Sequence, residues 1–334
     1  MPLFNLLLLP FLAFRHVIHV MEIIDVFELS RASKNTFTRV KNAKRKVLPI
    51  RVLKGPIGQE INVAVAKNAG FEFTIVFEIL IRPAIGKIDV RGCVIDISEK
   101  NMQNKTIRCC SRQFEPHVLQ FLHYLLDLFF TDQLSVRIDE PRLERMRREL
   151  SDPVYQKCVD IIVRGEGEDI RPLEIKYLLE KTQPTQEVLI NCVLPDDFDQ
   201  KQILNIPRIC INFARWVTFE DLKTMTCQMA TFNIHSFNEA AFSDFIRHWM
   251  SGGSSNLEYL KLGDFTETPN WTVVMKDIRY KYYDGRRRER FLKIPHTYSI
   301  RQVDFATGVD FERSDGTWAT VMHRDNCMEF AVWR

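Results

Sequence analysis

The sequence predicts an α/β protein, and three of its features carry that prediction. Apolar strand-like runs alternate with amphipathic helical runs between residues 134 and 262. Near the C-terminus, apolar and polar residues alternate around Asp315 and Gly316, a pair typical of a hairpin turn. The first 40 residues carry apolar side chains at helical spacing. We therefore expect a short helical segment, a small antiparallel β unit, an irregular strand and helix arc, and a C-terminal antiparallel hairpin.

The composition fits a folded chain of one large or two ordinary domains. The sequence has 334 residues, of which 46% are hydrophobic and 27% are charged. These shares exclude global disorder, collagen and a disulfide-dense miniprotein. No unbroken apolar run of about 18 residues occurs, which excludes a polytopic membrane protein, and we expect no membrane partner.

The apolar N-terminus poses a choice between a cleaved leader and a folded helix. No Lys or Arg precedes residues 3–14, and no small-x-small cleavage signal follows them. After Pro10, the apolar residues Val17, Ile18 and Met21 keep helical spacing. Proline suits the first turn of a helix, because its missing N–H costs nothing there. We expect a folded helix; a secreted repeat protein is the alternative that requires leader cleavage.

The same segment, residues 4–40, resembles an F-box. A Leu-Pro pair opens an apolar helix, Met21 follows, and a Leu-Ser-x-x-Ser-Lys stretch closes the segment at residues 29–34. About forty residues in short helices make only a partial core, so their surplus apolar stripe must be buried on another protein. The resemblance implies that the partner that covers this stripe is the Skp-type adaptor of a cullin-RING ubiquitin ligase. Two core helices packed on the next domain would show the same spacing. The adaptor contacts implied by the resemblance are Leu9, Pro10, Val17, Ile18, Met21, Ile24 and Phe27.

Residues 46–130 predict a β-rich connecting region that ends in a helix. Pro49 restricts the first strand to a sheet edge. From Pro116, apolar residues recur at helical spacing, which predicts a helix at 115–130. The expected strands, separated by Gly and Pro, cover residues 47–53, 60–66, 71–80 and 87–97.

From residue 134 onward, strands and helices alternate. The period of 20–30 residues favours a leucine-rich-repeat-like arc. A doubly wound α/β domain is the rival, but the strands lack a glycine-rich phosphate loop. The clearest helix is expected to begin at Ser236 with a capping box to Glu239, and to end at Gly252. The expected strands cover residues 134–138, 158–163, 188–193, 208–213, 230–235 and 257–262.

The C-terminal half resembles the type-2 F-box-associated domain. The resemblance rests on FNEAAFSDFIRHWMSG, on SSNLEYLKL and on the ending SDGTWATVMHRDNCMEFAVW. It spans residues 155–334 and is weaker between 45 and 130. The ending also predicts a hairpin and a third strand that cover the open edge of the arc. The resemblance implies that residues 131–334 form a domain that binds a protein substrate.

Positive charge is concentrated in two stretches. Residues 1–60 carry ten Lys and Arg against four acids, and residues 276–293 hold eight basic residues among aromatic ones. Such stretches attract nucleic acid or an acidic protein surface. A nucleic-acid-binding module through residues 39–54 and 276–293 is therefore the alternative function. The simpler interpretation is a solvated face, with an exposed hairpin that turns at Asp284 and Gly285.

The sequence offers no catalytic or cofactor motif. Eight cysteines occur without a Cys-x-x-Cys pair, and His16 and His19 are the only close histidines, so we expect no metal. No Gly-x-Ser-x-Gly motif occurs. We expect a non-catalytic chain without cofactors. Its free thiols indicate a reducing, intracellular compartment, either cytoplasmic or nuclear or both.

The expected function is substrate recognition in a Skp-cullin-F-box ubiquitin ligase, which acts in ubiquitin-dependent protein degradation. The F-box-like segment would bind the adaptor and through it a cullin. The C-terminal domain would hold a protein substrate whose contact residues the sequence does not identify.

Overall fold

The chain folds into a mixed α/β architecture, as the sequence predicts. The computed structural model describes residues 6–55, 58–66, 70–78, 83–111, 114–139, 147–165, 171–265 and 267–334. The described residues divide into two units. Unit 1 contains those up to 139 together with 147–159 and 297–299, and unit 2 contains those in 160–296 and 300–334.

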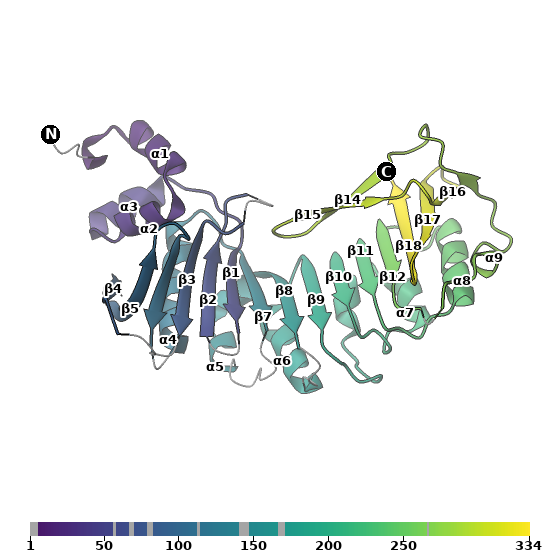
Figure 1. Ribbon diagram of the computed structural model, residues 1–334, viewed down its shortest axis with the longest axis horizontal. Coiled ribbons are helices and arrows are strands. Elements are labelled where there is room, and N and C mark those ends of the chain that lie inside the picture. Colours follow the sequence, from purple (N-terminus) through teal and green to yellow (C-terminus); the bar gives the residue numbers. More distant parts are fainter. Residues whose placement is uncertain are drawn as a thin grey trace. The chain divides into compact units, whose positions relative to one another are not determined.

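Unit 1 begins with three short helices in the predicted helical segment. A 3₁₀ turn, η1 (Leu6–Leu8), leads into α1 (Phe11–Val20), α2 (Ile23–Ser30) and α3 (Lys34–Asn42), drawn in purple in Figure 1. Pro10 directly precedes α1, and the Ser33 hydroxyl caps α3 by accepting a hydrogen bond from the Thr36 N–H at 3.1 Å. The identity of these helices as an F-box stays a prediction, and the expected boundary at residue 4 lies outside the described residues.

Seven described strands of unit 1 lie in the order β7-β1-β2-β3-β6-β5-β4. The pairs β1–β7 and β3–β6 are parallel, and the other four pairs are antiparallel. The predicted edge position of the first strand is wrong, because β1 pairs with a strand on each side. The expected small antiparallel unit is therefore wrong in part. Parallel neighbours need a long connection, and the chain provides one in each case. The hairpin of β4 and β5 lies between β3 and β6 in the chain, and the helix α4 (Phe114–Leu128) lies between β6 and β7. Residues 79–80 of the predicted third strand lie outside the described residues. The strands are β1 (Ile50–Lys54), β2 (Gly58–Val63), β3 (Phe73–Glu78), β4 (Gly86–Val90), β5 (Cys93–Asn101), β6 (Thr106–Cys110) and β7 (Leu134–Ile138).

An aromatic cluster forms the centre of unit 1. The ring of Phe27 on α2 lies 5.0 Å from Phe73 on β3 and 5.9 Å from Tyr124 on α4, between ring centroids. Phe121 on α4 also contacts Phe77 edge-on at 5.3 Å. Because Phe27 is fully buried, α2 is part of the core of unit 1. The short helices α5 (Arg147–Leu150) and η3 (Pro153–Lys157) complete the unit.

Five parallel strands form one part of unit 2. They are β8 (Cys158–Arg164), β9 (Glu187–Asn191), β10 (Arg208–Ile211), β11 (Met229–Phe232) and β12 (Tyr259–Leu262), paired in that order. Each starts within two residues of its predicted start, so the strand prediction is confirmed. Their likeness to leucine-rich repeats stays a prediction.

Helices and 3₁₀ turns link these parallel strands. The links include α6 (Pro172–Thr182), η4 (Lys201–Asn205), α7 (Phe219–Thr224) and α8 (Glu239–Met250). The expected capping box at Ser236 is wrong, because the Asn238 side chain caps α8 by accepting a hydrogen bond from the Ala241 N–H at 2.9 Å. Trp249 on α8 is fully buried, with its ring 5.3 Å from that of Phe330.

An antiparallel C-terminal meander continues the sheet of unit 2. It consists of β16 (Val309–Glu312), β17 (Trp318–Arg324) and β18 (Cys327–Trp333), and β18 pairs with β12. The predicted hairpin, third strand and covered edge are confirmed. A predicted hairpin at Asp284 is wrong, because β13 (Lys281–Tyr282) pairs with β16 instead. The short helix α9 (Trp271–Val274) precedes β13.

Two strands of unit 2 form a separate sheet. They are β14 (Phe291–Pro295) and β15 (Ile300–Asp304), which pair antiparallel. Ile294 and Val303 pack inward on Met229 and Tyr259, and Phe305 joins the same buried cluster. This sheet therefore covers part of the β11–β12 face.

Candidate functional site

The seven residues predicted to contact an adaptor divide into buried and accessible ones. Ile18, Ile24 and Phe27 are at most 2% exposed, because their side chains pack within unit 1. Their own chain covers these three side chains, and their contact role also stays a prediction. The contact role stays a prediction for the half-buried or exposed residues Leu9, Pro10, Val17 and Met21.

Large apolar side chains are exposed around α1. The exposed fractions are 80% for Leu8, 46% for Phe11, 76% for Leu12 and 69% for Val20. Leu8, Phe11 and Leu12 lie close together in the chain, and we call these three residues the apolar patch. They were not among the predicted contacts, because helical spacing marks apolar residues without showing which of them the core leaves uncovered. Grouped exposed apolar residues mark interaction sites more often than isolated ones do.

Arg39 fixes the segment that carries the apolar patch. From α3, its guanidinium donates hydrogen bonds to the carbonyl oxygens of Leu7 at 2.5 Å and Leu9 at 3.0 Å. It also lies 4.7 Å from the ring centroid of Phe14. These contacts tie η1 and the start of α1 to α3.

The first basic stretch, residues 39–54, does not form one free cationic surface. Lys41 pairs with Asp127, and Arg51 lies 3.9 Å from the ring centroid of Tyr298. Lys54 reaches the buried carboxylate of Glu149 at 3.2 Å. Since these cations already have partners within unit 1, the structure gives the nucleic-acid alternative no added support at this stretch.

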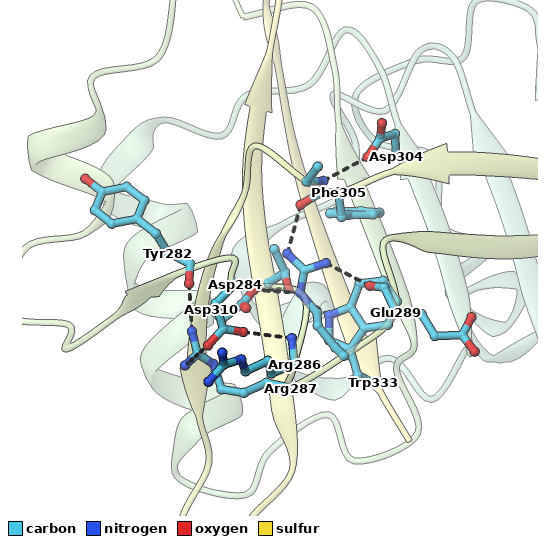
Figure 2. Close-up of polar contacts among 12 residues, drawn as sticks. Tyr282, Asp284, Arg286, Arg287, Glu289, Asp304, Phe305, Asp310 and Trp333 are labelled. Atoms are coloured by element: carbon cyan, nitrogen blue, oxygen red, sulfur yellow. Dashed lines mark hydrogen bonds and ion pairs between the residues drawn. The ribbon is translucent and has the colours of Figure 1, made fainter.

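The second basic stretch is organised around Arg288. Its guanidinium donates to Asp310 Oδ1 at 2.7 Å, to the Glu289 carbonyl at 2.9 Å and to the Phe305 carbonyl at 2.8 Å. The Thr320 hydroxyl also donates to Asp310 at 2.6 Å. Figure 2 shows Asp310, Glu289 and Phe305, with dashed lines for the polar contacts among the residues drawn. Arg288 is therefore a structural centre of unit 2 and not a solvated surface charge.

Two neighbouring arginines are also paired. Arg287 lies 2.9 Å from Asp284, and Arg290 lies 2.6 Å from Asp304. The Arg290 hydrogen bond and the Ala306 N–H lower the pKa of Asp304 to about 2. In contrast, the side chains of Arg286 and Lys293 are exposed and have no ionic partner among the residues that the structure describes.

A pocket of about 530 Å³ lies beside Arg288 in unit 2. The side chains of Trp318 and Trp333 provide its aromatic walls, and Phe291, Leu292 and Val332 add apolar surface. We call it the Trp pocket. Pockets of this size hold ligands or single side chains of a partner. Its charged lining residues are Glu258, Arg287, Arg288, Glu289, Lys293 and Arg334.

A ladder of asparagines follows the ends of three parallel strands. The Asn212 amide donates to Asn191 Oδ1 at 2.7 Å, and the Asn233 amide donates to Asn212 Oδ1 at 2.8 Å. The three residues lie 21 apart in sequence, a regular spacing that could have revealed them. At β12 the matching position is Gly263, where a Cβ would lie 2.2 Å from Asn233 Oδ1.

A charged group on β9 binds the end of β14. The Glu187 carboxylate lies 2.7 Å from His296 Nδ1 and 3.4 Å from Arg208 Nε. Burial raises the pKa of Glu187, but the hydrogen bond and charge of His296, together with Arg208, outweigh it and hold the pKa below its usual value. The group helps to hold the β14–β15 sheet to β9.

Other site types were sought among the described residues. There, no group of three or more His, Cys, Asp or Glu is close enough to hold a metal ion. The part of the chain that the structure describes also has no helix long and apolar enough to cross a membrane. The eight cysteines are free, and burial raises the pKa of Cys192 to about 12, so its thiol stays protonated.

Comparisons with known proteins found one family model that matches part of this chain, at residues 197–262. This segment matches the family model described as F-box associated. The uncharacterized protein F59B2.9 of Caenorhabditis elegans is 23% identical over 99% of this chain and 79% of its own length. The uncharacterized protein F54H12.5 of the same organism is 23% identical over 99% of this chain and 93% of its own length. No solved structure matches the chain.

Proposed function

We propose that this chain is a substrate-recognition subunit of a Skp-cullin-F-box type ubiquitin ligase, without a catalytic step of its own. The apolar patch is the observation that carries the proposal, because it stays exposed on a segment that Arg39 fixes to unit 1. The F-box-associated match at residues 197–262 supports a substrate-recognition role in general.

The apolar patch is the surface proposed for the Skp-type adaptor, which in turn binds a cullin. Fully burying a Leu or Phe side chain contributes about 1.5–3 kcal/mol, so Leu8, Phe11 and Leu12 could anchor a partner. Exposed Arg15 and Lys34 lie on the same helical segment. A matching partner surface would therefore combine an apolar groove with acidic residues at its edge.

Unit 2 is proposed to hold the protein substrate. A chain that binds the adaptor through unit 1 and a substrate through unit 2 raises the effective concentration of the substrate near the ubiquitin-transferring enzyme. No bond is made or broken on the chain itself in this proposal.

Adaptor binding tests the proposal with a matched pair of variants. The double variant Leu8→Asp/Leu12→Asp places charge on the apolar patch, and we expect its affinity for a purified Skp-type adaptor to fall at least about tenfold. The control Leu173→Asp changes a 72% exposed leucine on α6, and binding should persist. Binding of the double variant equal to that of the unchanged chain would contradict the proposal, provided circular dichroism shows all three chains folded.

A further inference from the structure

Strand β14 has an open edge. It pairs only with β15 in a two-stranded sheet of the described residues. The Phe305 N–H donates to the Arg290 carbonyl at 2.9 Å, which makes that pair a hydrogen-bonded one. In an antiparallel ladder such pairs alternate. The backbone N–H and C=O groups of Phe291 and Lys293 therefore point away from β15, toward the open edge.

The open edge of β14 borders the Trp pocket. Phe291, Leu292 and Lys293 of β14 line the pocket, whereas no residue of β15 does. Trp318 on β17 and the end of β18 also line the pocket. Unpaired backbone groups thus lie next to a pocket with aromatic walls. Strand-adding peptides use this combination, with main-chain hydrogen bonds for affinity and a pocket for a side chain.

The charge around this edge selects the occupant. Arg287, Arg288 and Arg290 are balanced by Asp284, Asp310 and Asp304. The exposed cations that remain are Arg286 and Lys293, together with Lys281, which lies 5.4 Å from the ring centroid of Trp318. Glu289 is the exposed acid among them. This surplus of positive charge fits an acidic segment and disfavours a basic one.

We propose that β14 accepts an extended acidic peptide segment as a third strand, with one apolar side chain of the peptide in the Trp pocket. This inference rests on the proposed function, because the segment belongs to the substrate that unit 2 would recruit. The N–H groups of Phe291 and Lys293 donate to the peptide backbone. Lys293 and Arg286 attract its carboxylates.

A synthetic peptide tests this geometry on the full chain. The probe alternates aspartate with valine around a central phenylalanine, and two counterparts replace aspartate by lysine or alternate valines by proline. We expect a shift of tryptophan fluorescence, because Trp318 and Trp333 line the pocket, and a Kd on the order of 100 μM for the acidic probe. The lysine peptide should not bind. The proline peptide lacks the needed N–H groups and should bind at least about tenfold more weakly.

Charge-reversal variants separate this site from a general surface effect. Arg286→Glu/Lys293→Glu changes two exposed residues, and we expect the acidic probe to bind about tenfold more weakly. The control Lys87→Glu, on an exposed position of β4 in unit 1, should bind normally. No binding by the acidic probe, or equal binding by the lysine or proline peptide, would overturn the inference. So would displacement of the probe at 0.15 M salt by an oligothymidine, which would indicate nucleic acid instead.

Adaptor binding measured on the same preparations keeps the two proposals apart. A chain that binds the adaptor but not the acidic probe retains the proposed function and loses only the β14 site. A chain that binds the probe but not the adaptor keeps a peptide-binding edge and loses the ubiquitin ligase role.

Discussion

Arg288 and Asp310 form an ion pair 2.7 Å long, with each side chain only 1% exposed. The arginine also lies 4.4 Å from the ring centroid of Tyr283 and 4.8 Å from that of Trp333. Thr320 extends the network, because its hydroxyl donates to Asp310 and accepts from the Trp333 indole N–H at 2.7 Å. One buried charge pair thus joins the segment before β14 to the meander of β16, β17 and β18.

Removing one member of this pair should destabilise unit 2 strongly. Asp310→Ala leaves the Arg288 charge buried and unpaired, which costs about 3–5 kcal/mol of unfolding free energy. Urea unfolding followed by tryptophan fluorescence measures it, since all five tryptophans lie in unit 2. The exposed pair of Arg247 and Asp244 on α8 supplies the control: Asp244→Ala should cost less than about 1 kcal/mol. Equal losses for the two variants would contradict the view that burial makes the Arg288 pair critical.

A buried glutamate plays a similar role in unit 1. Glu149 is fully buried and accepts hydrogen bonds from Lys54 at 3.2 Å, Gln59 at 2.6 Å and Tyr155 at 3.3 Å. Glu149→Ala should therefore destabilise unit 1 by about 3 kcal/mol or more, because Lys54 loses its counter-ion. Hydrogen exchange of the β1 and β2 amides measures this, with Glu99→Ala as an exposed control. Unchanged protection of β1 in Glu149→Ala would refute it.

Local sequence patterns account for much of unit 2 and less of unit 1. The parallel strands follow from runs such as Val188–Ile190, in which buried residues alternate within a few positions. In contrast, Leu12 and Ile18 are both apolar residues of one helix, yet the first is exposed and the second buried. That difference depends on what packs against α1, which no spacing rule contains.

The candidate sites show the same limit. The asparagine ladder has a sequence signal in its 21-residue period, whereas the partner of Arg288 does not. Asp310 lies 22 residues further along the chain and is one of several acids in reach of the basic stretch. Pairing Arg288 with Asp310 requires the β16–β17 register, which local propensity does not fix. For that reason a stretch that looks solvated in sequence contains a buried cation.

The asparagine ladder should contribute measurably to the stability of the parallel strands. Asn212 is its central member, since it donates to Asn191 and accepts from Asn233. Asn212→Ala removes both bonds, and we expect a loss of about 1–3 kcal/mol. Urea unfolding by tryptophan fluorescence gives the value. Asn326→Ala, at an exposed turn, is the control and should stay within about 0.5 kcal/mol. A loss no larger than that of the control would mean that the ladder is only a packing feature.

His235 should make unit 2 less stable in acid. Burial lowers its pKa from 6.5 to about 4, and the nearby charge of Asp264 opposes this only in part. The unfolded chain therefore binds more protons than the folded chain between these values, so the unfolding free energy is retained above pH 6.5 and falls as the pH drops toward 4. By pH 5 the loss is at most about 2 kcal/mol. Urea unfolding followed by tryptophan fluorescence measures this loss between pH 7.5 and pH 5. Over that range, His235→Leu should lose less unfolding free energy than the unchanged chain. The control His16→Leu changes an exposed residue of unit 1 and should keep the original pH dependence. The same acid sensitivity in His235→Leu would exclude His235 as the cause.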